Sequence, residues 1–242
     1  MDIYLIEYAR GCFYMKKYVM ELSMTCLLLV SFYFLSREAA VVSREIRQEN
    51  KVILIDPGHG GMDPGMIGIG NLEEKGINLS IAMLIRDDLE KKGFRVVMTR
   101  TGDEGLYEED CANKKAQDMQ RRIALIREKS PVLSVSIHQN SYQDSSVKGP
   151  QVFYYEGSAE GRELAESIQK KLNEELDVQR PRMAKGNTSY YLLKRSPGIL
   201  AIVECGFLTN PEEAAKLKTE SYQKKAAQAV SEGICEYIEK NK

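Results

Sequence analysis

The stretch KVILIDPGHGG at residues 51–61 joins a strand signal to a tight turn and a histidine. Lys51–Asp56 contains the continuous apolar run VILI and ends at Asp-Pro-Gly, as expected for a buried strand followed by a turn. His59 comes directly after the turn. The stretch therefore predicts a buried strand that delivers a histidine to one edge of a sheet.

Downstream of this strand, short apolar runs alternate with segments of helical periodicity. Further strands are expected at Arg95–Thr99, Val132–Ile137, Gln151–Tyr155 and Ile199–Val203. Helices are expected at Asn78–Lys92, Lys115–Lys129, Ser158–Leu176 and Tyr222–Ile238, with another beginning at Asn210-Pro211. This alternation predicts a single α/β domain: a mostly parallel or mixed central sheet of about six strands, flanked by helices.

The composition fits a globular protein without a nucleic-acid partner. The 242 residues carry 43% hydrophobic and 29% charged side chains and a net charge of −1. Basic and acidic residues are mixed along the chain, whereas a nucleic-acid-binding protein has a basic stripe. The five cysteines form no Cys-x-x-Cys pair, so a thiolate zinc site is not indicated. We interpret them as small buried side chains and leave open one disulfide among Cys111, Cys205 and Cys235.

Residues 1–36 are expected to lie outside the domain, as a signal peptide or a membrane anchor. Leu22–Leu35 is an apolar run with Arg10, Lys16 and Lys17 before it. Its length of about 14 residues suits a signal peptide, and extension back to Tyr18 makes a spanning anchor possible. Because no clean Ala-x-Ala cleavage site follows, we favour the anchor. Either form predicts an extracytoplasmic domain at residues 51–242, after a polar tether at 37–50.

Three ionisable residues are predicted to reach the same edge of the sheet. His59 and His138, the two histidines of the chain, each follow a buried run, and Glu204 follows the run ILAIV in the same way. Ligands of open α/β sheets bind beyond the carboxyl ends of the strands. A lone histidine at a strand end is more often structural, but the coincidence of three such residues favours a site.

Two histidines and one carboxylate form the ligand set of many catalytic zinc sites. The carboxylate could come from Glu73 or Glu74, which follow the glycine-rich loop DPGHGGMDPGMIG. A glycine-rich loop can instead bind phosphate at a helix N-terminus. Two acids in the first turn would repel a phosphate, however. We therefore favour a metal site with Zn²⁺ as the ion.

The string IDPGHGGMDPG at residues 55–65 resembles the opening signature of the zinc-dependent N-acetylmuramoyl-L-alanine amidases of the amidase type 3 family. Further blocks follow in the family's order, at residues 74–75 with 78–79, 98–100, 136–140 and 203–210. The resemblance covers about Val52 to Ile238. It implies that His59, Glu74 and His138 bind zinc and that Glu204 is the catalytic acid–base.

The resemblance also implies a substrate. Enzymes of this family hydrolyse the amide between the lactyl group of N-acetylmuramic acid and L-alanine of the peptidoglycan stem peptide. Arg122 and Asn140 are candidates for substrate contacts. A bare catalytic domain behind one hydrophobic segment is similar to the amidases of spore-forming bacteria that act on cortex peptidoglycan at germination. The alternatives are a zinc peptidase or other small-substrate amidohydrolase, and an inactive wall-binding homologue. An activator protein is left open.

Overall fold

The computed structural model describes residues 20, 22–38, 52–176 and 178–241. Residues 22–38 are helical, and the elements from residue 52 onwards belong to a separate compact unit. None of the helices in the described ranges is long and apolar enough to cross a membrane. The predicted signal or anchor at 1–36 and the tether at 37–50 fall largely outside these ranges and stay predictions.

The domain is built on one six-stranded mixed sheet with the order β4-β1-β5-β8-β6-β7. The strands are β1 (Val52–Pro57), β4 (Arg95–Met98), β5 (Leu133–Asn140), β6 (Gln151–Tyr155), β7 (Lys185–Asn187) and β8 (Leu200–Phe207). Strands β4, β1, β5 and β8 run parallel, whereas β6 pairs antiparallel with β8 and parallel with β7. The predicted fold class, a single α/β domain with a mixed central sheet, is confirmed.

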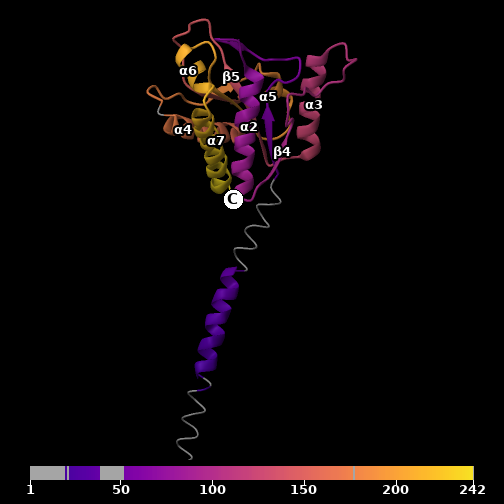
Figure 1. Cartoon of the computed structure of the whole chain (residues 1–242). Helices are drawn as coiled ribbons and strands as arrows, with labels where there is room; N and C mark the ends of the chain where they lie inside the picture. Colours follow the sequence, from indigo (N-terminus) through magenta and orange to yellow (C-terminus); the bar gives the residue numbers. More distant parts are fainter. Residues whose placement is uncertain (1–19, 21, 39–51, 177, 242) are drawn as a thin grey trace, which may run out of the picture. The chain divides into compact units, whose positions relative to one another are not determined.

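Helices cover both faces of the sheet. On one face lie α2 (Glu74–Lys91), α4 (Ala159–Glu175) and α7 (Glu220–Lys240), and Figure 1 shows α2 and α7 side by side. On the other face lie α3 (Lys114–Lys129) and the short α5 (Tyr191–Arg195). Side chains alternate along a strand, so Ile53 and Ile55 of β1 pack towards the first face and Leu54 towards the second.

Local sequence explains where two of the helices begin. Helix α6 (Pro211–Leu217) starts after Asn210, whose side chain accepts the N–H of Glu213, and has proline at its first position, as predicted. Helix α2 begins at Glu74, where the acidic pair Glu73-Glu74 was expected to start it, and four residues before the periodic run from Asn78. The preceding loop caps it, because the carbonyls of Met66 and Pro64 accept the N–H groups of Glu74 and Lys75 at 3.0 and 3.1 Å.

The structure differs from the sequence-based prediction at the ends of two central strands. Strand β5 was expected to end at Ile137 and β8 at Val203, but both continue because His138 pairs with Glu204, and Asn140 with Phe207 after a register shift. The two-residue strands β2 (Ile67–Gly68) and β3 (Leu72–Glu73), the three-residue β7 and the single-turn α5 were not predicted. Such elements are too short to produce a periodic pattern. The four described cysteines at 26, 111, 205 and 235 are all free.

Candidate metal centre

The register of the two central strands places His138 directly beside Glu204. Their sequence neighbours Ile137 and Val203 are buried against α2, α4 and α7. Because successive side chains alternate between faces, His138 and Glu204 point to the opposite side, under α3 and α5. Asp56 of β1 points the same way, since Ile55 packs on the first face. Three strands therefore direct polar side chains towards one cavity.

His59, Glu74 and His138 form a cluster in which one ligand atom from each lies within 4.8 Å of the others. His59 Nε2 is 3.2 Å from one Glu74 carboxylate oxygen, and His138 Nδ1 is 2.9 Å from the other. The Glu74 side chain is 4% exposed, whereas that of Glu73 is 50% exposed and faces Lys75. Of the two glutamates that the sequence left open, Glu74 is therefore the one in the cluster.

Further hydrogen bonds orient these three side chains. Asp63 Oδ2 lies 2.8 Å from His59 Nδ1, which leaves the Nε2 atom facing Glu74. The Glu74 carboxylate accepts the backbone N–H groups of Met66 and Gln139 at 2.9 and 3.0 Å. Metal-binding histidines usually donate their second ring nitrogen to a carboxylate or carbonyl in this way. The donor set and its supports fit a zinc ion.

Two glycines leave room for the cluster. A Cβ atom at Gly58 would lie 2.1 Å from Cε1 of the His138 ring. At Gly65, where φ is +70°, a Cβ would lie 2.5 Å from a Glu74 carboxylate oxygen. His59 itself has φ of 62°, a conformation that is uncommon for residues other than glycine and occurs often at functional sites. The glycine-rich loop therefore serves close packing around the ligand side chains.

The charges in the cluster stabilise one another. Burial alone would lower the pKa of His59, but hydrogen bonds with Asp63 and Glu74 outweigh it and raise the pKa to about 9. Burial opposes ionisation of Glu74, yet its hydrogen bonds with His138 and His59 hold its pKa well below the usual range. The cluster thus attracts positive charge, and protons compete with a metal ion for the His59 ring.

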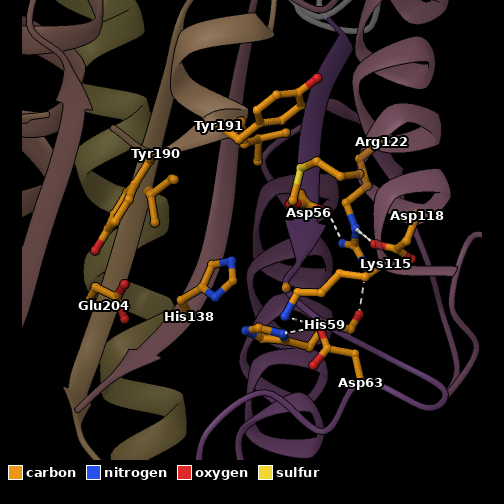
Figure 2. A pocket seen from close by; sticks show the side chains of 14 residues that line it. Asp56, His59, Asp63, Lys115, Asp118, Arg122, His138, Tyr190, Tyr191 and Glu204 are labelled. Carbon is orange, nitrogen blue, oxygen red and sulfur yellow. Dashed lines mark hydrogen bonds and ion pairs between the residues drawn. The ribbon is translucent and has the colours of Figure 1, made fainter. Parts of the chain in front are cut away.

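Glu204 lies beside the cluster in a different environment. It is 7% exposed, and its Oε2 atom is buried and has no hydrogen-bond partner among the described residues. Burial raises the pKa of Glu204 to about 7; the histidines oppose this shift and the Glu74 charge adds to it. Figure 2 shows Glu204 next to His138, with Tyr190 beside it. All three line a cavity of about 250 Å³, which also contacts His59.

Arg122 lies in the wall of this cavity, but its hydrogen bonds go to the protein. The side chain is 2% exposed and pairs with Asp56 and Asp118 (Figure 2). It also donates to the backbone carbonyls of Pro57 and His59 at 2.8 and 2.7 Å. These bonds occupy all of its N–H groups, so the structure gives Arg122 a positioning role; a substrate contact stays a prediction.

Asn140 lies at the end of β5, outside the lining of this cavity. Its side-chain oxygen accepts the N–H of Ser141 at 2.8 Å. The predicted substrate contact therefore stays untested. Sequence reasoning overlooked Asp63 and Tyr190. Asp63 lies four residues after His59 in the quoted motif, so a search for a carboxylate partner of the histidine would have found it. No sequence signal marks Tyr190.

This α/β domain brings a His-Glu-His cluster that could hold a metal ion and a buried glutamate to one cavity, a combination typical of metal-dependent hydrolases. The sequence model of the Amidase_3 family, described as N-acetylmuramoyl-L-alanine amidase, matches residues 53–236. The chain therefore belongs to the Amidase_3 family. It is an N-acetylmuramoyl-L-alanine amidase, which cleaves the bond between N-acetylmuramic acid and L-alanine in peptidoglycan, as the sequence predicted. Cell-wall amidases of this family act outside the cytoplasm.

Individual relatives agree with this assignment. A germination-specific N-acetylmuramoyl-L-alanine amidase of Bacillus subtilis (strain 168) is 38% identical over 191 residues, which are 78% of this chain and 80% of the relative. The CwlD amidase from Clostridioides difficile, solved in complex with the GerS lipoprotein, shows 35% identity and a TM-score of 0.76 over 78% of this chain and 99% of that one. An amidase from Clostridium difficile 630 shows 30% identity and a TM-score of 0.71, with 80% and 100% covered.

Proposed function

We propose that this amidase is zinc-dependent, with His59, Glu74 and His138 as ligands and Glu204 as the general acid–base. The observation that carries the proposal is the cluster itself, in which three ligand atoms lie within 4.8 Å of one another beside the buried Glu204 carboxylate. Two histidines and one carboxylate leave a fourth position for water or substrate. A bound zinc ion supplies a Lewis acid that makes water more nucleophilic at neutral pH and polarises a carbonyl.

The chain's own residues then have defined tasks. Glu204 accepts a proton from water as the water oxygen bonds to the lactyl carbonyl carbon. It returns this proton to the alanine nitrogen as the C–N bond breaks, so the products are the lactyl carboxylic acid and the alanine amine, which ionise to carboxylate and ammonium at neutral pH. Proton transfer of this kind typically contributes about 10² to 10⁴ in rate. Asp63 holds the His59 ring in place, and the backbone of Met66 and Gln139 fixes Glu74.

We further propose that the natural substrate is spore-cortex peptidoglycan and that residues 1–36 keep the enzyme at the membrane. The name of the Bacillus subtilis relative supports the first part, and the basic residues ahead of the apolar run support the second. Digestion of purified cortex and of vegetative sacculi tests the substrate: cortex should release alanine N-termini faster. A zinc peptidase would instead cleave free peptides. Protease accessibility of intact protoplasts tests the membrane attachment.

Zinc dependence is tested with a matched pair of neighbouring glutamates. Chelation should abolish the release of stem peptides from peptidoglycan, and added zinc should restore it. Glu74→Gln should lower both the zinc content measured by mass spectrometry and the activity, because an anionic ligand becomes neutral. Glu73→Gln should change neither, since its side chain is 50% exposed and outside the cluster. Activity without detectable metal, or a reversed result for the two variants, would refute the ligand set.

A further inference from the structure

A second cavity, of about 570 Å³, lies beyond the carboxyl ends of the two strands that carry His138 and Glu204. It is lined by Met66, Ser141, Tyr142, Gln143 and Thr209. Ser141 directly follows β5, and Thr209 comes two residues after β8. Two hydrogen bonds join these walls: Leu208 N–H to the Asn140 carbonyl at 2.8 Å, and Tyr142 N–H to Thr209 Oγ1 at 3.0 Å.

This cavity adjoins the metal cluster. Met66 lines it and also donates its backbone N–H to the Glu74 carboxylate at 2.9 Å. The β2–β3 hairpin after Met66 is held to the other wall, because Ile69 N–H donates to the Leu208 carbonyl at 3.2 Å. The Met66 backbone is therefore shared between the wall of the second cavity and the support of Glu74.

The two cavities differ in charge. The first is lined by charged groups, in which the carboxylates of Asp56 and Asp118 pair with Arg122 and that of Asp63 with His59. Lys115 adds a positive charge at the cavity wall, on a side chain that is 79% exposed. In the second, none of the five lining residues is charged. It presents a 60% exposed tyrosine ring, an amide, two aliphatic hydroxyl groups and a thioether. Within the described residues, the side chains of Ser141 and Gln143 make no hydrogen bond to the protein, so their polar groups face solvent.

The two halves of the substrate differ in the same way. The glycan strand consists of neutral pyranose rings with hydroxyl and acetamido groups, whereas the stem peptide carries free carboxylates. We propose that the second cavity is the glycan subsite, in which the Tyr142 ring packs against a sugar face. Ser141, Gln143 and Thr209 then hydrogen-bond to its polar substituents. The stem peptide extends into the first cavity, where Lys115 can approach its carboxylates. This inference rests on the amidase activity and not on zinc or on the cortex as substrate.

Binding measurements on the full enzyme test this assignment independently of turnover. The probes are a stem-free N-acetylglucosaminyl–N-acetylmuramic acid oligosaccharide and the free stem peptide, with dissociation constants from NMR titration. Tyr142→Ala should weaken oligosaccharide binding by roughly 2- to 10-fold, the range expected for one aromatic contact, and leave peptide binding unchanged. Tyr191→Ala is the matched control, because this tyrosine is also exposed, at 50%, but lines the first cavity. It should leave oligosaccharide binding unchanged.

Two results would overturn the assignment. Weaker peptide binding with unchanged oligosaccharide binding in Tyr142→Ala would place the stem peptide in the second cavity. Unchanged binding of both probes would mean that substrate does not use this cavity. Retained peptide affinity in Tyr142→Ala shows that the variant is folded. Failure of the zinc mechanism gives a different result, since metal-free protein would then keep its hydrolytic activity, whatever Tyr142→Ala does to oligosaccharide binding.

Discussion

The two faces of the central sheet use the same strands for different purposes. On the face covered by α2, α4 and α7, most side chains of β1, β5 and β8 are apolar and buried, and those of β4 are partly buried. On the face under α3 and α5, a smaller apolar cluster gives way to Asp56, Ser136, His138 and Glu204 near the carboxyl ends of the strands. Successive side chains of each strand point to opposite faces of the sheet. The first face can therefore stabilise the fold through apolar packing, while the second holds the polar groups of the site in place.

The polar face is held by one buried network. Asp56, 1% exposed, accepts hydrogen bonds from Thr99 and Ser136 at 2.6 Å each and pairs with Arg122. Burial disfavours its charge, but Arg122 and the two hydroxyls outweigh this and hold the pKa of Asp56 below its usual range. The effects of substitutions on the two faces should therefore be distinguishable when hydrolysis rate, zinc affinity and the free energy of unfolding are measured separately.

The largest effect is expected at Glu204. Glu204→Gln keeps the shape of the side chain but removes the proton acceptor, so the hydrolysis rate should fall by about 10² to 10⁴. Zinc content and the melting temperature should stay near wild type. Peptidoglycan digestion and metal analysis on the same preparation measure both quantities. A zinc-free variant would show that Glu204 is itself a ligand and that the base lies elsewhere.

Asp56→Asn should destabilise the protein by about 3–5 kcal/mol, because the buried Arg122 loses the more deeply buried of its two carboxylate partners. The pH dependence has a defined sign. Since the folded-state pKa of Asp56 lies below the ordinary aspartate value of 3.8, its stabilisation is present above that pH and is lost as pH falls through the folded pKa. In urea titrations, the difference between variant and wild type should be constant above about pH 5 and shrink below about pH 4.

A control for this substitution is Glu236→Gln, which removes an exposed ion pair with Lys170. It should cost no more than about 1 kcal/mol. If Asp56→Asn were equally mild at neutral pH, the buried network would not hold the polar face together.

Ile81→Ala probes the apolar face on the same helix that carries Glu74. Ile81 is fully buried, so the cavity left by its side chain should cost about 2–5 kcal/mol in the free energy of unfolding. The folded variant should still bind zinc with wild-type affinity. Denaturant unfolding and a metal titration below the transition measure the two effects. A parallel loss of zinc affinity would show that the two faces are coupled.

A smaller effect is expected from Asp63→Asn, which weakens the hydrogen bond between this side chain and His59 Nδ1. Zinc affinity should fall by about 10- to 100-fold, with little change in stability. Competition with a chelating dye gives the dissociation constant. Asp87→Asn is a suitable control, because Asp87 is exposed and pairs only with Arg86 in the described structure. Equal zinc affinity in the two variants would exclude a positioning role for Asp63.

Sequence predicts those parts of the molecule that depend on local pattern. The β1 run, the capped start of α6 and the apolar periodicity of α3 and α7 each reflect neighbouring residues, and the structure agrees with them closely. The meeting of His59, His138 and Glu204 was predictable because parallel strands present their carboxyl ends on one edge. The choice of Glu74 over Glu73 came from the family resemblance.

The remainder depends on contacts between distant segments. In the sequence, Arg122 is one polar position on a predicted amphipathic helix. Nothing near it in the sequence indicates that it pairs with Asp56, 66 residues away. The extension of β5 and β8 through His138 and Glu204 was missed because charged residues normally end a buried run; here each faces a cavity. The second cavity joins residues near 66, 141 and 209, which no local pattern connects.

Arg100 and Arg122 together donate hydrogen bonds to three successive backbone carbonyls of the loop that carries His59. Arg100 donates to Pro57 and Gly58 at 3.1 and 2.9 Å, and Arg122 donates to Pro57 and His59. The loop therefore loses its conformational entropy when the chain folds, and ligand binding does not have to order it. Preorganisation of this kind lets a site keep its geometry when its ligand dissociates. The same molecule can then bind the ligand again and recover activity without refolding.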